Sequence, residues 1–240
     1  MKRLSGALFA ILLAALLGMG VMAFTTAAPE TSPPPASDTE PVQALPEPAP
    51  EADWRLTLVN DENPLPTGFE PDTAEADGGY LFDIRAVEPL RALLQAGREA
   101  GLDLVITSAW RSWEYQDKLF EDKTARVMDE TGLDRIAAEA AAAVEVARPG
   151  TSEHQLGLAV DIISNDHPEL DEGWAETEEA KWLTENCAQY GFILRYPPDK
   201  SDITGIVWEP WHFRYVGEDA AAYIMENGLC LEEYLEQRAG

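Results

Sequence analysis

The chain has 240 residues, of which 45% are hydrophobic and 25% charged, as expected for one globular domain with additional non-globular segments. Its formal net charge of −27 would repel the phosphates of nucleic acid and argues against docking on anionic lipid through basic patches. We attribute this charge to solubility, for which no acidic-specific partner is needed.

The N-terminal segment has the pattern of an export signal. Lys2 and Arg3 precede an uncharged apolar run from Ala7 to Phe24, and a basic start before such a run is typical of export signals. The run is also about long enough to cross a bilayer. Residues 1–26 are therefore predicted to be a cleaved signal peptide or a retained membrane anchor, with the rest of the chain outside the cytoplasm.

Residues 27–52 are predicted to form a disordered, proline-rich linker. Proline and acidic residues dominate this segment, and large apolar residues are nearly absent. Such a segment cannot bury enough apolar surface to fold, and its prolines favour an extended spacer. The folded domain is predicted to cover residues 53–240. Residues 1–52 contain five acidic and two basic residues, so the domain itself has a net charge of −24.

The first half of this domain is predicted to be mostly helical. Apolar residues at helical spacing, followed by Gly101, indicate a helix over Ile84–Ala100. The other elements expected here are a strand over Arg55–Asn60, a loop over Asn63–Asp72, a buried strand over Leu104–Ser108, and helices over Ser112–Asp129 and Leu133–Val146.

The second half is predicted to supply most of the strands. Pro149-Gly150 indicates a loop over Arg148–Glu153. The elements that follow are a strand over Leu156–Ile163, a helix over Glu176–Tyr190, strands over Phe192–Tyr196 and Trp208–Val216, a helix over Asp219–Asn227 and a short final helix. This order predicts an α+β fold with a small mixed or antiparallel sheet packed with helices.

The two cysteines allow two interpretations. Cys187 falls in a predicted helix and Cys230 near the C-terminus. In an exported chain they can form a disulfide, provided that their backbones lie close enough, or they can be two buried thiols. The sequence leaves both interpretations open.

The first segment that suggests chemistry contains His154 and Asp161. Asp161 comes at the end of an apolar strand, where a carboxylate is costly unless it is paired or bound to a metal. His154 is seven positions earlier, an odd spacing that would put it on the opposite face of one continuous strand. We therefore expect His154 on a loop before the strand, with Gly150 and Gly157 allowing the chain to bend.

The second segment contains Glu209 and His212. Pro210 removes a donor from the strand ladder, so an edge or a bulge is expected there. That irregularity allows Glu209 and His212 to reach one cavity. Three neighbouring aromatic residues are expected to make its walls apolar, namely Trp208, Trp211 and Phe213.

Together these segments offer the ligands of a catalytic zinc site. His154, Asp161 and His212 would leave a fourth position of a tetrahedral ion for water, and Glu209 could accept a proton from that water. The competing interpretation is that the histidines are satisfied by local hydrogen bonds, since no HExxH helix is present. His167, in a polar loop, is interpreted as non-catalytic.

Several motifs together resemble the VanY-type D-alanyl-D-alanine carboxypeptidases, a family of zinc peptidases. The resemblance covers about residues 54–230, and the motifs occur in the order of the family. They are Ser108-Ala109-Trp110-Arg111-Ser112 with Gln116, Ser152-x-His154-x-x-Gly157-x-Ala159-x-Asp161, Phe192-Ile193-Leu194-Arg195-Tyr196-Pro197, Glu209-Pro210-Trp211-His212 and Arg214-Tyr215-Val216-Gly217. Trp110 is a departure, because tyrosine is common at that position.

The resemblance implies a hedgehog-like zinc D,D-peptidase fold that hydrolyses the terminal D-alanyl-D-alanine bond of peptidoglycan stem peptides. It implies one zinc ion per chain, bound by His154, Asp161 and His212, with Glu209 as the catalytic base. It also implies that Arg111 contacts the substrate and that Ser152 lies in the substrate site.

The side-chain chemistry of Arg111 and Ser152 agrees with these implied roles. Arg111 offers a planar pair of donors suited to a carboxylate or a developing oxyanion, and its alternative is a surface salt bridge. Ser152 is expected to donate to the substrate or to cap a loop. Gln116 is expected to support Arg111 or to line the substrate cleft, whereas Arg195 and Arg214 are expected to form structural ion pairs.

Two other functions remain open at this stage. An L,D-endopeptidase acting on peptidoglycan peptides would use the same ligands, and a non-catalytic zinc-stabilised cell-wall binding module would need no Glu209. The expected protein is a monomer whose only membrane contact is its N-terminal segment. It is expected to be extracytoplasmic, either anchored or secreted.

Overall fold

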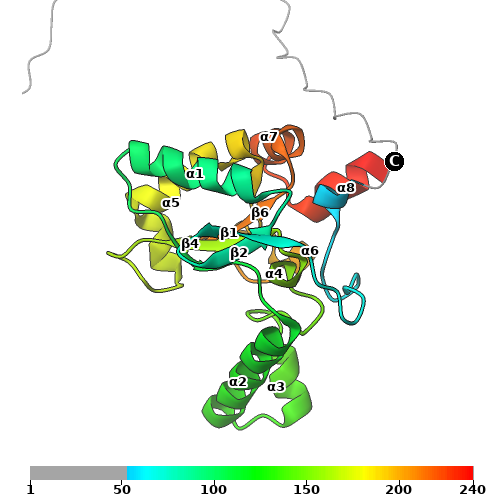
Figure 1. Cartoon of the computed structure of the whole chain (residues 1–240). Coiled ribbons are helices and arrows are strands. Elements are labelled where there is room, and N and C mark those ends of the chain that lie inside the picture. The colour runs from blue at the N-terminus through cyan, green and yellow to red at the C-terminus, as the bar shows by residue number, and fades with distance from the viewer. Residues whose placement is uncertain (1–52, 240) are drawn as a thin grey trace, which may run out of the picture. The chain divides into compact units, whose positions relative to one another are not determined.

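A four-stranded antiparallel sheet lies at the centre of the computed structural model, which describes residues 53–239 (Figure 1). Its strands are ordered β3 (Val105–Ser108), β4 (Ala159–Ile163), β6 (His212–Tyr215) and β5 (Phe192–Leu194). Every pairing in it is antiparallel. The α+β prediction is confirmed, and of the mixed and antiparallel alternatives the sheet is antiparallel.

The alternation of side chains in β4 and β6 separates the core from the site. Val160 and Ile162 of β4 and Phe213 of β6 join the main apolar core with Leu90. Because successive side chains on a strand point to opposite faces, Asp161, which lies between Val160 and Ile162, faces the other side of the sheet.

Helices lie on both sides of this sheet. The amphipathic helix α1 (Val87–Glu99) contributes its buried leucines to the core, and α2 (Trp113–Thr131) and α3 (Arg135–Ala142) form a hairpin on the other side (Figure 1). The remaining helices are α4 (Glu153–Leu156), α5 (Glu178–Asn186), α6 (Ser201–Thr204), α7 (Glu218–Glu226) and α8 (Leu231–Ala239), with 3-10 helices η1 (Trp54–Leu56), η2 (Glu172–Glu176) and η3 (Cys187–Tyr190). None of the helices within residues 53–239 is long and apolar enough to span a bilayer.

The strand predicted over Arg55–Asn60 is wrong. Asp53 instead caps the short helix η1, since its Oδ1 accepts the Arg55 backbone N–H at 3.1 Å. The carbonyl oxygens of Arg55 and Thr57 accept hydrogen bonds from Arg214 Nη2 at 2.9 and 2.8 Å. This segment therefore satisfies its backbone through an arginine from β6 rather than through a neighbouring strand.

A hairpin that the sequence reading did not predict precedes α1. It consists of β1 (Thr73–Asp77) and β2 (Tyr80–Asp83), which pair antiparallel around Gly78 and Gly79. Both glycines have positive φ, which a two-residue hairpin turn requires.

Several element boundaries also differ from the predictions. The strand predicted from Leu156 begins at Ala159, because residues 153–156 form α4, and the strand predicted from Trp208 begins at His212. The backbone N–H of His212 bonds to the carbonyl oxygen of Glu209 at 3.1 Å, so a turn precedes β6. The predicted helices are present with shifted ends: α1 and α3 are shorter than predicted, whereas α2 continues two residues beyond Asp129. The Ser112 side chain caps the first turn of α2.

Cys187 and Cys230 are both free and buried, so the interpretation as two thiols is correct. The predicted signal or anchor over residues 1–26 and the linker over 27–52 lie outside the described residues.

Candidate metal centre and active site

The register of two neighbouring strands brings Asp161 and His212 together. Asp161 of β4 is paired directly with His212 of β6, and side chains directly opposite each other on neighbouring strands are close enough to interact. The distance from His212 Nδ1 to Asp161 Oδ1 is 3.1 Å. Residues 51 positions apart in sequence therefore become neighbours because of the sheet.

His154 reaches the same place from α4, the four-residue helix that precedes β4. Gly157 ends this helix with φ of 83°, a left-handed conformation that suits glycine. A Cβ at this position would also lie 2.9 Å from Pro71 Cγ. The chain thus turns from α4 into β4 in two residues, and His154 lies on a helical turn rather than on the expected loop.

Three donor atoms meet in a geometry that fits one zinc ion. His154 Nε2 lies 3.3 Å from Asp161 Oδ2, and one ligand atom from each of His154, Asp161 and His212 lies within 4.8 Å of the others. Ligand atoms about 2.0–2.2 Å from a tetrahedral zinc are roughly 3.3–3.6 Å apart. Asp161 Oδ1 is buried and makes no hydrogen bond, although His212 Nδ1 lies 3.1 Å from it, so this site contains an anionic oxygen that a cation would neutralise.

The histidine His154 is held ready to act as a neutral ligand. Its Nδ1 lies 2.7 Å from the carbonyl oxygen of Ala109, so Nδ1 carries the hydrogen and Nε2 presents its lone pair toward Asp161. Burial lowers the pKa of His154 to about 4. Burial opposes ionisation of Asp161, but His154 and His212 hold the pKa of this carboxyl well below its usual range.

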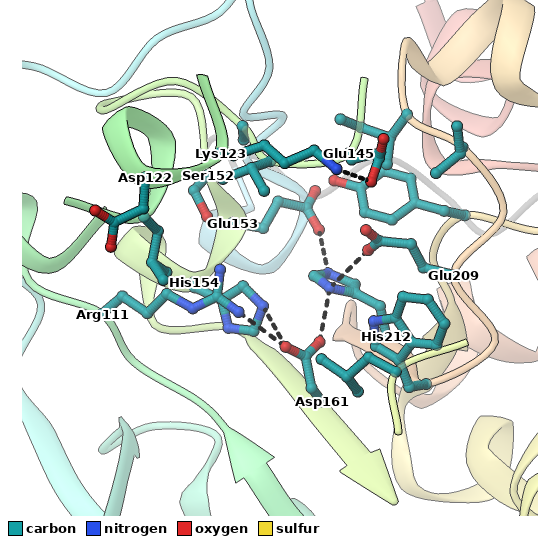
Figure 2. A pocket seen from close by; sticks show the side chains of 18 of the residues that line it. Arg111, Asp122, Lys123, Glu145, Ser152, Glu153, His154, Asp161, Glu209 and His212 are labelled. Carbon is teal, nitrogen blue, oxygen red and sulfur yellow. Dashed lines mark hydrogen bonds and ion pairs between the residues drawn. The ribbon is translucent and has the colours of Figure 1, made fainter. Parts of the chain in front are cut away.

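Glu209 lies beside this group, just before β6 (Figure 2). Its Oε2 is 3.5 Å from His212 Nδ1, and its side chain is 12% exposed. Burial raises the pKa of Glu209 to about 7. A carboxyl group with such a pKa can accept and return a proton near neutral pH, which is the property required of a general base that later acts as an acid.

Arg111 forms a second wall of the site and is positioned by three contacts. Its Nε donates to Ser108 Oγ at 2.8 Å, Nη2 to Asp161 Oδ2 at 2.9 Å and Nη1 to Gln116 Oε1 at 3.3 Å. Gln116 is completely buried, and its Nε2 donates to Ala147 at 2.7 Å. Of its two expected roles, Gln116 therefore has the supporting one, because it lies behind Arg111 rather than in the cavity wall.

The zinc-ligand group opens into a cavity of about 430 Å³. Ser152 lines it, and although Ser152 is at the N-cap position of α4, its side chain makes no capping hydrogen bond. Of the three aromatic residues expected in the walls only Trp211 lines the cavity, since Phe213 points into the core. His167 is paired with Asp171 and lies elsewhere, as expected of a non-catalytic residue.

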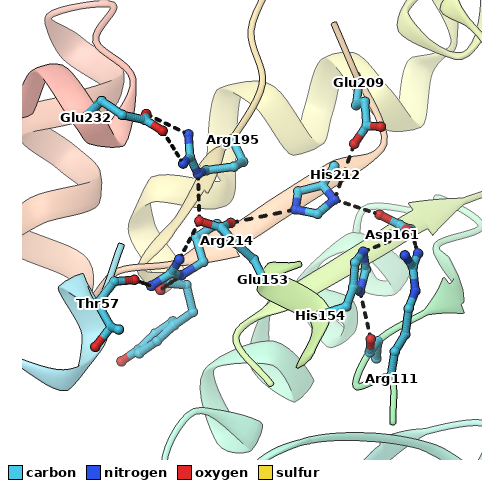
Figure 3. Close-up of polar contacts among 12 residues, drawn as sticks. Thr57, Arg111, Glu153, His154, Asp161, Arg195, Glu209, His212, Arg214 and Glu232 are labelled. Atoms are coloured by element: carbon cyan, nitrogen blue, oxygen red, sulfur yellow. Dashed lines mark hydrogen bonds and ion pairs between the residues drawn. The ribbon is translucent and has the colours of Figure 1, made fainter. Parts of the chain in front are cut away.

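Glu153 is a buried residue of the site that sequence reasoning did not single out. Its Oε1 accepts from Arg214 Nη1 at 2.6 Å and from Arg195 Nε at 2.8 Å, and these arginines hold its pKa well below the usual range against the effect of burial (Figure 3). Arg195 also forms a two-pronged pair with Glu232. The expectation that Arg195 and Arg214 form structural ion pairs is confirmed, and the partner they share lies behind His212.

Comparison with known proteins gives a consistent result. Residues 80–218 match the family model VanY, described as D-alanyl-D-alanine carboxypeptidase. A D-alanyl-D-alanine carboxypeptidase of Enterococcus faecalis is 44% identical over 187 residues, which are 77% of this chain and 67% of that protein.

Two solved structures are similar to most of the domain. A VanY D,D-pentapeptidase from a VanB-type vancomycin-resistance cassette, solved with Zn(II), has a TM-score of 0.68 and 44% identity over 76% of this chain and 99% of its own. VanYB with D-alanine-D-alanine has a TM-score of 0.69 and 43% identity over 76% and 98%. The chain belongs to the VanY family of D-alanyl-D-alanine carboxypeptidases.

Proposed function

We propose that this protein is a zinc carboxypeptidase that hydrolyses the terminal D-alanyl-D-alanine bond of peptidoglycan stem peptides. The observation that carries this proposal is the convergence of His154, Asp161 and His212 on one buried point, with Glu209 beside them at the cavity. A closed structural zinc site would use four protein ligands, whereas three ligands with an adjacent carboxylate suit hydrolysis.

In this proposal His154, Asp161 and His212 would hold a zinc ion, which would supply a Lewis acid for the scissile carbonyl and lower the pKa of the attacking water. Glu209 accepts a proton from that water at its carboxylate and then donates it to the leaving amine of the terminal D-alanine. Its raised pKa suits both transfers near neutral pH.

Arg111 and Ser152 are proposed to hold the substrate. Three of the five N–H donors of Arg111 are used by protein contacts, which leaves two for the terminal carboxylate or the developing oxyanion. The Ser152 hydroxyl, which caps no helix, lines the same cavity and is available to donate to the substrate.

The place of action is also a proposal. The basic and apolar start of the chain supports export, with residues 1–26 as a signal peptide or an anchor and residues 27–52 as a spacer. A substrate in the cell wall requires such a location.

Product analysis on defined peptides tests this function. Purified protein with one equivalent of zinc should release free D-alanine from a pentapeptide ending in D-Ala-D-Ala, and a chelator should stop the release. Products other than D-alanine would support the L,D-endopeptidase. Full zinc content without any product would support the binding module.

A further inference from the structure

The cavity continues beyond the zinc-ligand group along one face of α2. Leu119, Asp122, Lys123 and Arg126 line it together with Glu209. Their spacing of i, i+3, i+4 and i+7 places these four α2 residues on one face of the helix. This part of the cavity contains charged groups that the proposed chemistry at the scissile bond does not use.

Arg126 differs from every other basic residue in the described part of the chain. Residues 53–239 contain fifteen lysines and arginines, and each of the other fourteen makes a hydrogen bond or an ion pair with another side chain or the backbone. Arg126 is exposed and makes neither within these residues. An unpaired arginine is unexpected in a domain this acidic, because partners are abundant.

The acidic residues that share the cavity wall with Arg126 have other partners. Asp122, one helical turn earlier, pairs with Lys118, and Glu145 on the facing segment pairs with Lys123. Both carboxylates are thereby drawn toward the two lysines. The guanidinium of Arg126 remains available in a cavity that leads to the zinc ligands.

The position of Arg126 along α2 separates it from the scissile bond. Arg111 precedes the first residue of α2 by two positions, and Arg126 follows that first residue by thirteen. With a rise of about 1.5 Å per residue, the Arg126 backbone lies roughly 20 Å along the helix, and its side chain leans back toward the helix N-terminus. An extended peptide advances about 3.3 Å per residue. A peptide that follows the cavity from the zinc-ligand group along α2 would therefore bring residues several positions before the scissile bond level with Arg126.

We propose that Arg126 forms a subsite for a carboxylate carried by the substrate peptide upstream of the scissile bond. This inference rests on the proposed carboxypeptidase function. The ligand class is a peptide ending in D-Ala-D-Ala with an acidic residue in its amino-terminal part. An exposed arginine and a carboxylate form such a pair without any rearrangement of the zinc-ligand group.

Matched peptides test this subsite. Each pair ends in D-Ala-D-Ala and differs only by glutamate or glutamine at a position two, three or four residues before the scissile bond. The wild-type protein should prefer the glutamate peptide in kcat/KM at one of these positions by roughly five-fold, the size expected for an exposed ion pair. The preference should weaken at high salt.

The Arg126→Gln variant should reduce the glutamate-to-glutamine ratio to about one. The control is Arg98→Gln, which removes an exposed arginine on α1 that pairs with Asp77 outside the cavity and should keep the ratio. An arginine that only stabilised α2 would change both peptides equally. A wild-type ratio of one at every position, or an unchanged ratio in Arg126→Gln, would overturn the subsite. Absence of D-alanine release from every peptide would instead reject the proposed function itself.

Discussion

The carboxylate of Glu153 lies behind the imidazole of His212, with Glu153 Oε2 3.8 Å from His212 Nε2. The other ring nitrogen, Nδ1, faces Asp161 and Glu209 (Figure 3). This distance is too long for a hydrogen bond, and neither Glu153 Oε2 nor His212 Nε2 has a hydrogen-bond partner among the described residues. Carboxylates behind histidine ligands orient the imidazole in zinc sites, and we predict that Glu153 does the same for His212 when Nδ1 binds a metal.

Replacing Glu153 with glutamine should weaken both zinc binding and folding. We expect zinc affinity to fall by about 10- to 100-fold, as is typical when the partner of a histidine ligand is lost. The variant also leaves Arg195 and Arg214 without their shared anion, which should cost about 3 kcal/mol of unfolding free energy or more. Competition titration with a zinc chelator and thermal unfolding measure the two effects. Unchanged zinc affinity with a lowered Tm would leave Glu153 a purely structural role.

The contribution of Glu153 to stability should depend on pH. The two arginines depress its pKa in the folded state, so its stabilisation is fully present above the unfolded value of about 4.5 and is lost as the pH falls below that value. The difference in Tm between the wild-type protein and Glu153→Gln should therefore narrow from pH 7 to pH 3. A difference that stayed constant over this range would contradict the ion-pair assignment.

The zinc-ligand set was predictable from the sequence, because its residues lie in short motifs with informative neighbours. Because the spacing of His154 and Asp161 is odd, the two side chains could not face the same side of one continuous strand. In the structure His154 instead lies on a helical turn that ends at Gly157. The direct pairing of Asp161 with His212 depends on sheet register. The sequence motifs imply that His154, Asp161 and His212 lie together, but they do not give the strand register that brings them together.

The role of Glu153 could not be predicted in this way. Its partners Arg195 and Arg214 lie 42 and 61 residues further along the chain, and only the fold brings them together. The hairpin around Gly78-Gly79 was predictable from the sequence, since two adjacent glycines between short potential strands favour a tight turn. The strand predicted from Arg55 is wrong because the carbonyl oxygen of Arg55 accepts a hydrogen bond from Arg214, a distant residue that the local sequence pattern does not indicate.

Loss of the carboxylate at Glu209 should stop catalysis without loss of metal. Glu209→Gln keeps the shape of the side chain but removes its ability to accept a proton, so kcat should fall by about 100- to 10,000-fold. Zinc content, measured by elemental analysis, should stay at one per chain. The matched control is Glu185→Gln, an exposed residue of α5 outside the cavity, which should retain full activity. Comparable activity of the two variants would remove Glu209 from the mechanism.

The two cysteines should be unreactive in the folded protein. Burial raises the pKa of Cys187 to about 12 and that of Cys230 to about 11, so at pH 8 only a minute fraction of either is thiolate, the reactive form. A thiol reagent at pH 8 should label neither residue in native protein and both after denaturation. Fewer than two labelled thiols in denatured, unreduced protein would indicate a disulfide.

The position of the metal tests the whole account most directly. Crystals grown with zinc and measured on both sides of the zinc absorption edge locate the ion by its anomalous scattering. We predict one peak per chain within bonding distance of His154 Nε2, an oxygen of Asp161 and His212 Nδ1, with Glu209 close by but not coordinated. A peak held by other residues, or no peak in protein that releases D-alanine, would contradict the account.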